Sequence, residues 1–380
     1  MNVRLFRPYL DEKDLESIKV AFDANWLGLG SRVGEFEEAW TNKFQVKHSL
    51  GLNSATAALH LALEAFKFPE GKKVLVPSMT FSSTAMAVMY THLEPVFVDC
   101  EPVNLTMDVE DLEKKIDEDC VAIIPVHYGG SACNMDRIME LAQKNNLKVI
   151  EDCAHTQGGT FNGRILGTIG DIGCFSFEEK KGMTTGDGGM LVCHDQEIFD
   201  YLKPMRWVGI DKDTWKRASE VEGLEDRSMH WFYEIRNLGF KYNMNNLSAS
   251  LGLSQLAKLD DINGTKNAAI KRYIQNLSSI PGIEFLMDYS EKSWTGSYWL
   301  FGLRLKNRPD FINFLTDKGV STGVHFTPLN EQPYWQKFTG NTPVSSEIYK
   351  QIVTLPLFPM MNLEEVDYVC EVISEYYNEL

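Results

Sequence analysis

Two segments decide the fold: KVIEDCAHTQGG at residues 148–159 and GTIGDIGCFSFEEKKGMTTGDGGMLV at residues 167–192. In the first segment an apolar Val-Ile pair leads into Asp152, as expected for a buried parallel strand that ends with a carboxylate. In the second segment an apolar run containing Ser176 is followed by a lysine pair and a glycine-rich stretch. Open α/β sheets bind ligands at the carboxyl ends of their strands. We therefore predict that one carboxylate and one amine meet at a common rim.

An aspartate and a lysine placed together suit pyridoxal phosphate as a cofactor. A lysine amine binds the aldehyde of this cofactor, and an aspartate pairs with its pyridinium nitrogen and keeps that nitrogen protonated. Both residue types also have plainer interpretations, because an aspartate at a strand end often caps a helix or turn and a lysine pair often lies on a solvated face. The order and spacing of the motifs favour the cofactor.

These motifs closely resemble the sugar aminotransferases of the DegT/DnrJ/EryC1/StrS family, which are enzymes of the aspartate aminotransferase fold type I. The family pattern reads D-x-A-H/Q, then F-S-F, then a lysine four residues after the second phenylalanine, then T-T-G-E-G-G. The chain follows it with DCAH from residue 152, FSF from residue 175 and TTGDGG from residue 184. That spacing selects Lys181, not Lys180, as the cofactor lysine.

The departures from the family pattern are mild. Glu178 and Glu179 stand where His-Pro is common, and Asp187 stands where glutamate is common. None of these positions has a cofactor role in the pattern, so the resemblance continues to imply a pyridoxal phosphate enzyme.

The resemblance also implies roles for single residues, with Lys181 and Asp152 as the catalytic pair. The residues implied to bind pyridoxal phosphate are Ala55, Thr56, Phe81, Asp152, His155, Ser176, Lys181 and Asn243. The small polar residues from Asn53 lead into a predicted helix whose free N–H groups accept a phosphate, although Ser54 or Thr56 also suits a simple N-cap. Phe81 alone also suits a core position, and His155 alone also suits a helix cap.

Substrate contacts and a partner subunit follow from the same resemblance. Trp26, Lys241 and His325 are implied to bind the substrate, and residues 238–244 of a neighbouring subunit are implied to reach the cofactor phosphate. A homodimer with shared active sites is therefore expected. Whether Lys241 or Asn243 contacts the phosphate stays open, and Trp26 alone also suits a packing anchor.

The rest of the chain predicts an α/β fold. Strand-like and helix-like runs alternate between residues 73 and 152, which specifies right-handed βαβ units and a mainly parallel sheet covered by helices on both faces. We expect a large cofactor-binding domain over residues 1–260, with an N-terminal arm, and a smaller α+β domain over residues 261–380. Residues 206–235 are expected to form a long loop. In the smaller domain we predict helices over 266–278, from about Asp310 and over 363–377, and strands over 298–305 and 320–326.

Composition excludes several classes of protein. The 380 residues are 44% hydrophobic and carry a net charge of -16, which argues against a nucleic-acid-binding surface. No segment approaches the roughly 18 continuous apolar residues of a membrane span, and the N-terminus lacks an apolar signal region. The 7 cysteines show no metal-ligand spacing and His127 has no second ligand close by in the sequence, so we predict no metal. Free thiols indicate a reducing cytoplasm.

We therefore predict a cytoplasmic aminotransferase in which Lys181 is the general base. Its predicted donor is an amino acid, L-glutamate, and its predicted acceptor is a nucleotide-linked 4-keto-6-deoxy sugar. The product is expected to be an amino sugar for a surface polysaccharide such as O-antigen or capsule. The open alternatives are a cyclitol ketone or a small keto-phosphate as substrate, a family dehydratase, and a regulatory relative without catalysis. Lys181 counts against a dehydratase, because dehydratases of the family replace this lysine.

Overall fold

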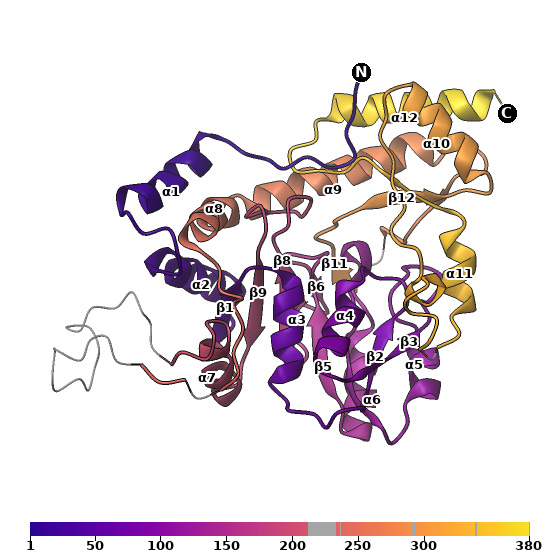
Figure 1. The fold of residues 1–380 in the computed structure, drawn as a ribbon. Helices are drawn as coiled ribbons and strands as arrows, with labels where there is room; N and C mark the ends of the chain where they lie inside the picture. Colours follow the sequence, from indigo (N-terminus) through magenta and orange to yellow (C-terminus); the bar gives the residue numbers. More distant parts are fainter. Residues whose placement is uncertain (212–232, 236, 291–292, 339, 380) are drawn as a thin grey trace.

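The computed structural model describes residues 1–211, 233–235, 237–290, 293–338 and 340–379, and Figure 1 shows their arrangement. The main sheet lies in the lower part of the view, and the long helices α9 (Leu259–Leu277) and α12 (Leu363–Asn378) lie above it. Most of the predicted loop over 206–235 lies outside the described residues. Within the described ranges, no helix combines the length and apolar character needed to cross a bilayer.

The main sheet is mainly parallel, as predicted. Its strands, in spatial order, are β1 (His48–Leu52), β9 (Gly189–Cys193), β8 (Ile172–Ser176), β5 (Lys148–Asp152), β4 (Cys120–Ile123), β2 (Lys73–Pro77) and β3 (Glu94–Val98). The five strands from β8 to β3 run parallel to one another, whereas β9 and β1 are antiparallel to their neighbours. Strand β1 was not predicted, because its sequence HSLGL is short and contains polar residues and a glycine.

Helices cover both faces of this sheet, which confirms the predicted fold class. On one face lie α3 (Ala55–Glu64), α4 (Ser83–Tyr90) and α7 (Gln196–Met205), and on the other lie α2 (Ser31–Phe44), α5 (Val109–Lys115) and α6 (Met135–Asn145). Because successive strand residues point to opposite faces, Leu191 packs with the first group of helices and Val192 with the second. Strands buried on both faces explain the continuous apolar runs of the sequence.

The remaining elements frame the sheet. Near the N-terminus, α1 (Glu12–Asp23) packs against α8 (Asn246–Ala257), and α9 packs against α12. A second sheet contains β10 (Glu284–Phe285), β12 (Phe301–Arg304) and β13 (Ile352–Leu355), and a third contains β11 (Trp294–Thr295), β6 (Thr160–Phe161) and β7 (Arg164–Ile165). The other helices are α10 (Arg308–Asp317) and α11 (Pro343–Tyr349), with short 3-10 turns at Tyr128–Gly130 and Leu329–Glu331.

The predicted strand over 320–326 was wrong. This run forms only single bridges, from Val320 to Val3 and from Gly323 to Thr354. Its apolar residues alternate like those of a strand, but no described segment of the chain pairs with this run over more than one residue at a time. The predicted strand over 298–305 is shorter than expected and corresponds to β12.

The helix predicted to begin at Lys266 begins at Leu259 instead, directly after α8. The predicted domain boundary between residues 260 and 261 therefore lies inside α9. The division of the chain into two domains stays a prediction.

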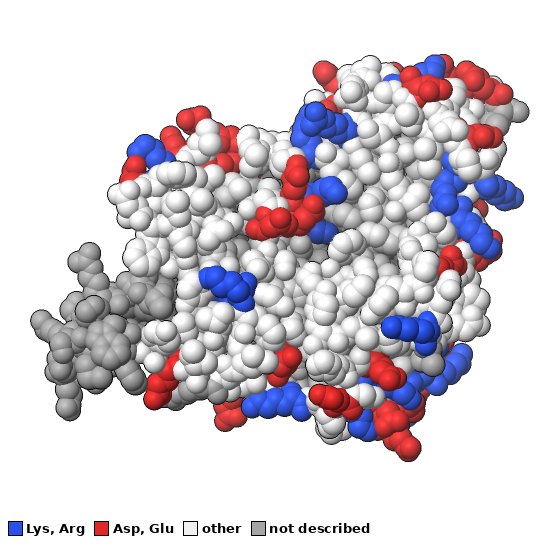
Figure 2. Space-filling model, viewed as in Figure 1, with Lys and Arg blue, Asp and Glu red and all other residues white. Residues whose placement is uncertain are grey.

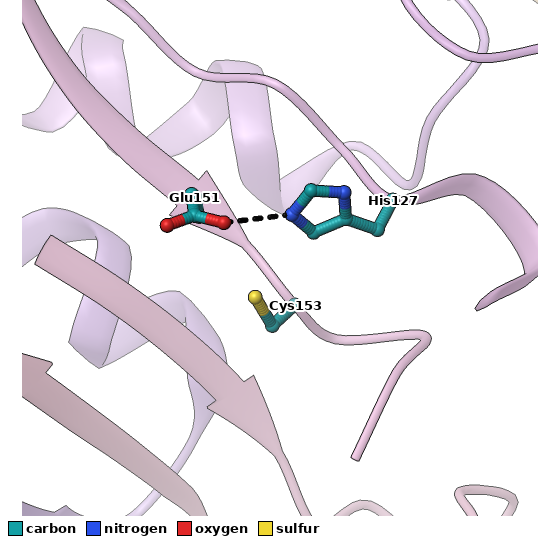
Figure 3. Close-up of side chains that lie close together, drawn as sticks. All are labelled: His127, Glu151 and Cys153. Atoms are coloured by element: carbon teal, nitrogen blue, oxygen red, sulfur yellow. Dashed lines mark hydrogen bonds and ion pairs between the residues drawn. The ribbon is translucent and has the colours of Figure 1, made fainter. Parts of the chain in front are cut away.

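A buried cluster lies behind the end of β5. Figure 3 shows Glu151, His127 and Cys153 together, and all three side chains are buried. His127 Nδ1 accepts a hydrogen bond from the Cys133 amide at 3.2 Å, so its Nε2 carries the proton and donates to Glu151 Oε2 at 3.0 Å. Both ring nitrogens are therefore occupied by hydrogen bonds.

The Glu151 carboxylate also organises the loop that leads into β8. It accepts hydrogen bonds from the amides of Gly167 at 2.8 Å, Ile169 at 2.7 Å and Gly170 at 2.7 Å. With the bond from His127, four donors surround this carboxylate, so its lone pairs are used within the protein. The cluster thus fixes the end of β5 and the start of β8, the two strands that carry Asp152 and Ser176.

Replacing the carboxylate of Glu151 should be costly for stability. In Glu151→Gln an amide N–H group meets backbone N–H groups, and at least one buried donor loses its acceptor. We expect the free energy of unfolding to fall by about 2 to 5 kcal/mol, measured by denaturant unfolding. The matched control is Glu118→Gln at an exposed position, which should change stability by less than about 0.5 kcal/mol. Equal stability of the two variants would contradict the role given to Glu151.

Candidate functional site

A cavity of about 370 Å³ opens at the carboxyl ends of β5 and β8. Asp152 ends β5, Ser176 ends β8, and residues of the first turns of α3 and α4 complete this side of the lining. Trp299, His325 and Phe326 come from the last third of the chain and line the other side. The predicted meeting of a carboxylate and an amine is found here, because Asp152 and Lys181 line the same cavity.

Most of the residues predicted for the site lie in this lining. They are Ala55, Thr56, Phe81, Asp152, His155, Ser176, Lys181 and His325. Asp152 lies two residues after Ile150 on β5, and Ser176 lies two residues after Cys174 on β8. Ile150 and Cys174 pack in the core beneath α3 and α4, and alternate residues of a strand point to the same face, so both site side chains point toward these helices.

Asp152 is buried and firmly held. Its Oδ2 accepts a hydrogen bond from the Thr84 hydroxyl at 2.8 Å, and its Oδ1 accepts one from the Ala154 amide at 3.0 Å. Burial raises the pKa of Asp152, whereas these two hydrogen bonds and the charge of Lys181 oppose the rise. The carboxylate is therefore oriented in advance toward a positive group in the cavity.

Lys181 has its side chain in the cavity, and it keeps partial exposure because the cavity is open. Its Nζ lies 4.1 Å from the centroid of the Trp299 ring. Burial by the surrounding protein lowers the pKa of Lys181 to about 8, although the negative charges of Glu178 and Asp152 act in the opposite direction. A lysine with this pKa can gain and lose a proton near neutral pH.

The N-terminus of α3 offers a site for an anion. Ser54 is the N-cap, and its hydroxyl accepts a hydrogen bond from the Ala57 amide at 3.1 Å. Thr56, the second residue of α3, lines the cavity, and its hydroxyl donates to Ser83 Oγ at 2.7 Å. The first amides of a helix have no partner within the helix, so they are available to a phosphate.

The glycine-rich stretch permits a close approach to this helix start. A Cβ at Gly189 would lie 2.4 Å from the Ser54 carbonyl carbon, and one at Gly188 would lie 2.2 Å from Thr185 Oγ1. Larger residues at either position would displace the chain. Gly189 therefore allows the end of the lysine loop to lie against the start of α3, and Gly188 allows a tight turn within that loop.

Phe81 and His155 differ from their plainer interpretations. Phe81 is 60% exposed, so it is not a core residue, and its ring lies 6.1 Å from that of Phe326. His155 lies in a turn after β5, not at a helix end, and its ring stacks on Trp299 at 4.2 Å. Burial and the charge of Lys181 keep the pKa of His155 well below its usual value, so its imidazole is neutral.

Three predicted residues lie outside the cavity lining of this chain. Trp26 is 46% exposed, and its indole N–H donates to the Leu29 carbonyl at 2.8 Å. Lys241 Nζ lies 3.1 Å from the centroid of the Trp207 ring. Asn243 donates to the Met244 carbonyl at 3.1 Å. The predicted site residues therefore divide into eight that line the cavity and these three, which lie outside its lining.

Sequence reasoning missed several lining residues. Thr84 was detectable, because it follows Phe81 by three residues at the start of a predicted helix and so shares its face. Trp299 had no local signal, because only the tertiary fold brings it to Lys181, whereas Phe326 directly follows His325, which the resemblance implied for the site. Glu178, Lys180 and Asp187 give the lining charges of both signs, and Figure 2 shows acidic and basic side chains together at a hollow in the middle of this face.

The arrangement has a defined chemical capability. It offers helix amides for a phosphate, a buried carboxylate for a protonated ring nitrogen, and an amine of lowered pKa for a carbonyl group.

Comparison with known proteins agrees with this chemistry. A profile of the DegT/DnrJ/EryC1/StrS aminotransferase family matches residues 8–374. The chain is 34% identical to the spore coat polysaccharide biosynthesis protein SpsC of Bacillus subtilis, over 97% of this chain and 95% of SpsC. It is 32% identical to the GDP-perosamine synthase of Escherichia coli O157:H7, over 99% of both chains.

Solved structures give the same result. Spr1654 from Streptococcus pneumoniae, in its PMP form, superposes with a TM-score of 0.91 at 26% identity and 100% coverage of both chains. A PLP form of the same protein superposes with a TM-score of 0.90 at 25% identity, over 100% of this chain and 99% of that one. The chain therefore belongs to the DegT/DnrJ/EryC1/StrS family and is a sugar aminotransferase that depends on pyridoxal phosphate.

Proposed function

We propose that the enzyme transfers an amino group from an amino acid, with L-glutamate as the donor, to a nucleotide-linked 4-keto-6-deoxy sugar. The observation that carries this proposal is the shared cavity, in which Lys181, Asp152 and the start of α3 meet. The relatives named for polysaccharide biosynthesis and for GDP-perosamine support a sugar nucleotide as the acceptor. The amino sugar would serve a surface polysaccharide such as O-antigen or capsule.

The residues of the cavity fit pyridoxal phosphate. Ala55 and Thr56 at the start of α3 would hold its phosphate, and Asp152 would pair with its ring nitrogen. Phe81, His155 and Ser176 line the same space and would contact the rest of the cofactor. When bound, the cofactor draws electrons away from the α-carbon of the amino donor.

Lys181 is the proposed base that moves a proton to and from the reacting carbon. A neutral amine is needed to accept this proton, and a pKa of about 8 leaves a usable neutral fraction at neutral pH. Asp152 keeps the opposite end of the cavity negative, and neutral His155 adds no competing positive charge. In this proposal Lys181 is the base and Asp152 is the anion that pairs with the ring nitrogen.

The lowered pKa of Lys181 is measurable without the cofactor. In cofactor-free protein, labelling of Lys181 by an amine reagent should rise with pH around a midpoint of about 8, followed by mass spectrometry of its peptide. In denatured protein the midpoint should return to about 10.4, which is the control. Because only the neutral amine accepts a proton, turnover should fall as the pH drops below the folded midpoint. Equal midpoints in folded and denatured protein would contradict the proposed environment.

The acceptor is best identified by a panel experiment. Protein loaded with pyridoxamine phosphate is offered UDP-, GDP- and dTDP-linked keto sugars, a cyclitol ketone and small keto-phosphates. Return of the aldehyde spectrum with one nucleotide sugar is the expected result. Lys181→Ala should slow the return of the aldehyde spectrum by about 100- to 10,000-fold, because this substitution removes the base. A response only to the cyclitol or keto-phosphates would refute the sugar nucleotide, and failure to bind any cofactor would favour a regulatory protein.

We further propose that two copies of the chain complete each site. Trp26, Lys241 and Asn243 lie outside the cavity lining of their own chain, although the resemblance assigns them to the substrate and the phosphate. Exposed apolar side chains are available for a partner, including Phe81 at 60% and Trp26 at 46%. We also propose that the enzyme works in the cytoplasm, since its seven cysteines are free and buried, which suits a reducing compartment.

Mixed dimers test the shared site. Lys181→Ala is combined with Asn243→Ala, and separately with Lys241→Ala, after subunit exchange. If each site takes Lys181 from one chain and the second residue from the other, mixing two inactive variants should restore about one quarter of native activity. The variant that is inactive alone and recovers on mixing identifies the phosphate contact. No recovery in mixtures with verified exchange would exclude a shared site.

A further inference from the structure

Trp299 is fixed beside the cavity by contacts that the proposed reaction does not explain. It is 6% exposed, and its backbone amide donates to the Gly129 carbonyl at 2.8 Å. Its ring stacks on His155 at 4.2 Å with an interplanar angle of 11°, and on Phe6 at 5.2 Å with an angle of 7°. A side chain held in this way has little freedom to move.

Two of its contacts are with the lysine loop. The indole Nε1 donates a hydrogen bond to the Lys180 carbonyl at 2.9 Å, and the ring face lies 4.1 Å from Lys181 Nζ. One side chain therefore contacts both the backbone that carries the lysine and the amine at its end. The face of an indole attracts a cation more strongly than that of the other aromatic side chains.

A buried lysine holds the backbone directly before Trp299. Lys266 of α9 is 2% exposed, and its Nζ donates to the Tyr298 carbonyl at 2.7 Å. A Cβ added at Gly182 would lie 3.1 Å from the same Nζ, so α9 also contacts the residue that follows Lys181. Gln157 Oε1, which the same Cβ would approach at 2.8 Å, accepts a hydrogen bond from the Met183 amide at 2.7 Å. The two residues that follow Lys181, Gly182 and Met183, are thus held by contacts with Lys266 and Gln157.

The charges around Lys181 do not hold its amine in this place by themselves. Glu178, Lys180, Asp152, His155 and His325 are the titratable groups that face it. The two histidines are neutral because burial lowers the pKa of each, that of His325 to about 4, and Lys180 opposes the attraction of the two carboxylates. None of these charged groups therefore defines one location for the amine, whereas the Trp299 ring face does.

We propose that Trp299 is a positioning residue that holds the loop and the amine of Lys181 in place for reaction with the cofactor. The proposal rests on the role of Lys181 in the proposed function. The hydrogen bond from the indole N–H holds the Lys180 carbonyl. The ring face holds the free Lys181 amine in one place whenever this amine is not bound to the cofactor.

Two variants separate these contacts. Trp299→Phe keeps an aromatic face and loses the indole N–H, whereas Trp299→Leu loses both. The matched control is Trp335→Leu, because Trp335 is 2% exposed and packs on Phe97 away from the cavity. The first readout is hydrogen exchange of the peptide over residues 178–183 in cofactor-free protein. The second is the fraction of Lys181 that borohydride links permanently to pyridoxal phosphate at a saturating concentration.

We expect faster exchange of residues 178–183 in both Trp299 variants and native exchange there in Trp335→Leu. Borohydride linkage should fall by about tenfold in Trp299→Leu and by less in Trp299→Phe. Native exchange and native linkage in a folded Trp299→Leu protein would overturn the proposal. If that variant does not fold, unchanged exchange in Trp299→Phe overturns it instead.

The experiment also separates this proposal from the proposed function. Exchange in cofactor-free protein reports the Trp299 contacts whether or not Lys181 binds the cofactor. If the native protein gives no borohydride linkage at Lys181, the proposed function fails, and the exchange readout still decides the role of Trp299.

Discussion

The alternation of side chains at the end of strand β5 is the constraint on which the site depends. Glu151 and Asp152 are adjacent, so the sheet sends one carboxylate to each face. Glu151 is surrounded by the imidazole N–H of His127 and backbone amides of the loop before β8, and it fixes the strand end. Asp152 is then presented to the cavity by a strand that cannot shift without breaking those bonds.

The two carboxylates illustrate how hydrogen bonding decides the use of a buried charge. Glu151 has all its acceptor capacity taken up by the protein, which makes it structural. Among the described residues, Asp152 accepts from the Thr84 hydroxyl and the Ala154 amide, so it retains capacity for a further donor. A buried carboxylate with spare capacity is favourable only when a positive or hydrogen-donating group completes it, which is the role that we propose for a protonated ring nitrogen.

Lys181 shows the complementary balance. Burial and the charge of Lys180 disfavour its charged form, whereas the charges of Glu178 and Asp152 favour it, so its pKa lies at about 8. A fully solvated lysine would stay protonated and could not act as a base at neutral pH.

The sequence by itself determined the sheet, its covering helices and the positions of Asp152 and Lys181, because strand and helix periodicity and motif spacing are local properties. The resemblance implied that His325 lies at the site, but the sequence did not determine the contacts of Trp299, nor that the run over 320–326 would form single bridges instead of a strand. These depend on which distant segments become neighbours, and a strand forms only where a second chain segment offers its hydrogen bonds. The sequence also did not determine where Trp26, Lys241 and Asn243 lie, because each contacts other residues of its own chain outside the cavity lining. The neighbours of a side chain that are distant in the sequence are decided by packing, and packing is a property of the folded chain as a whole.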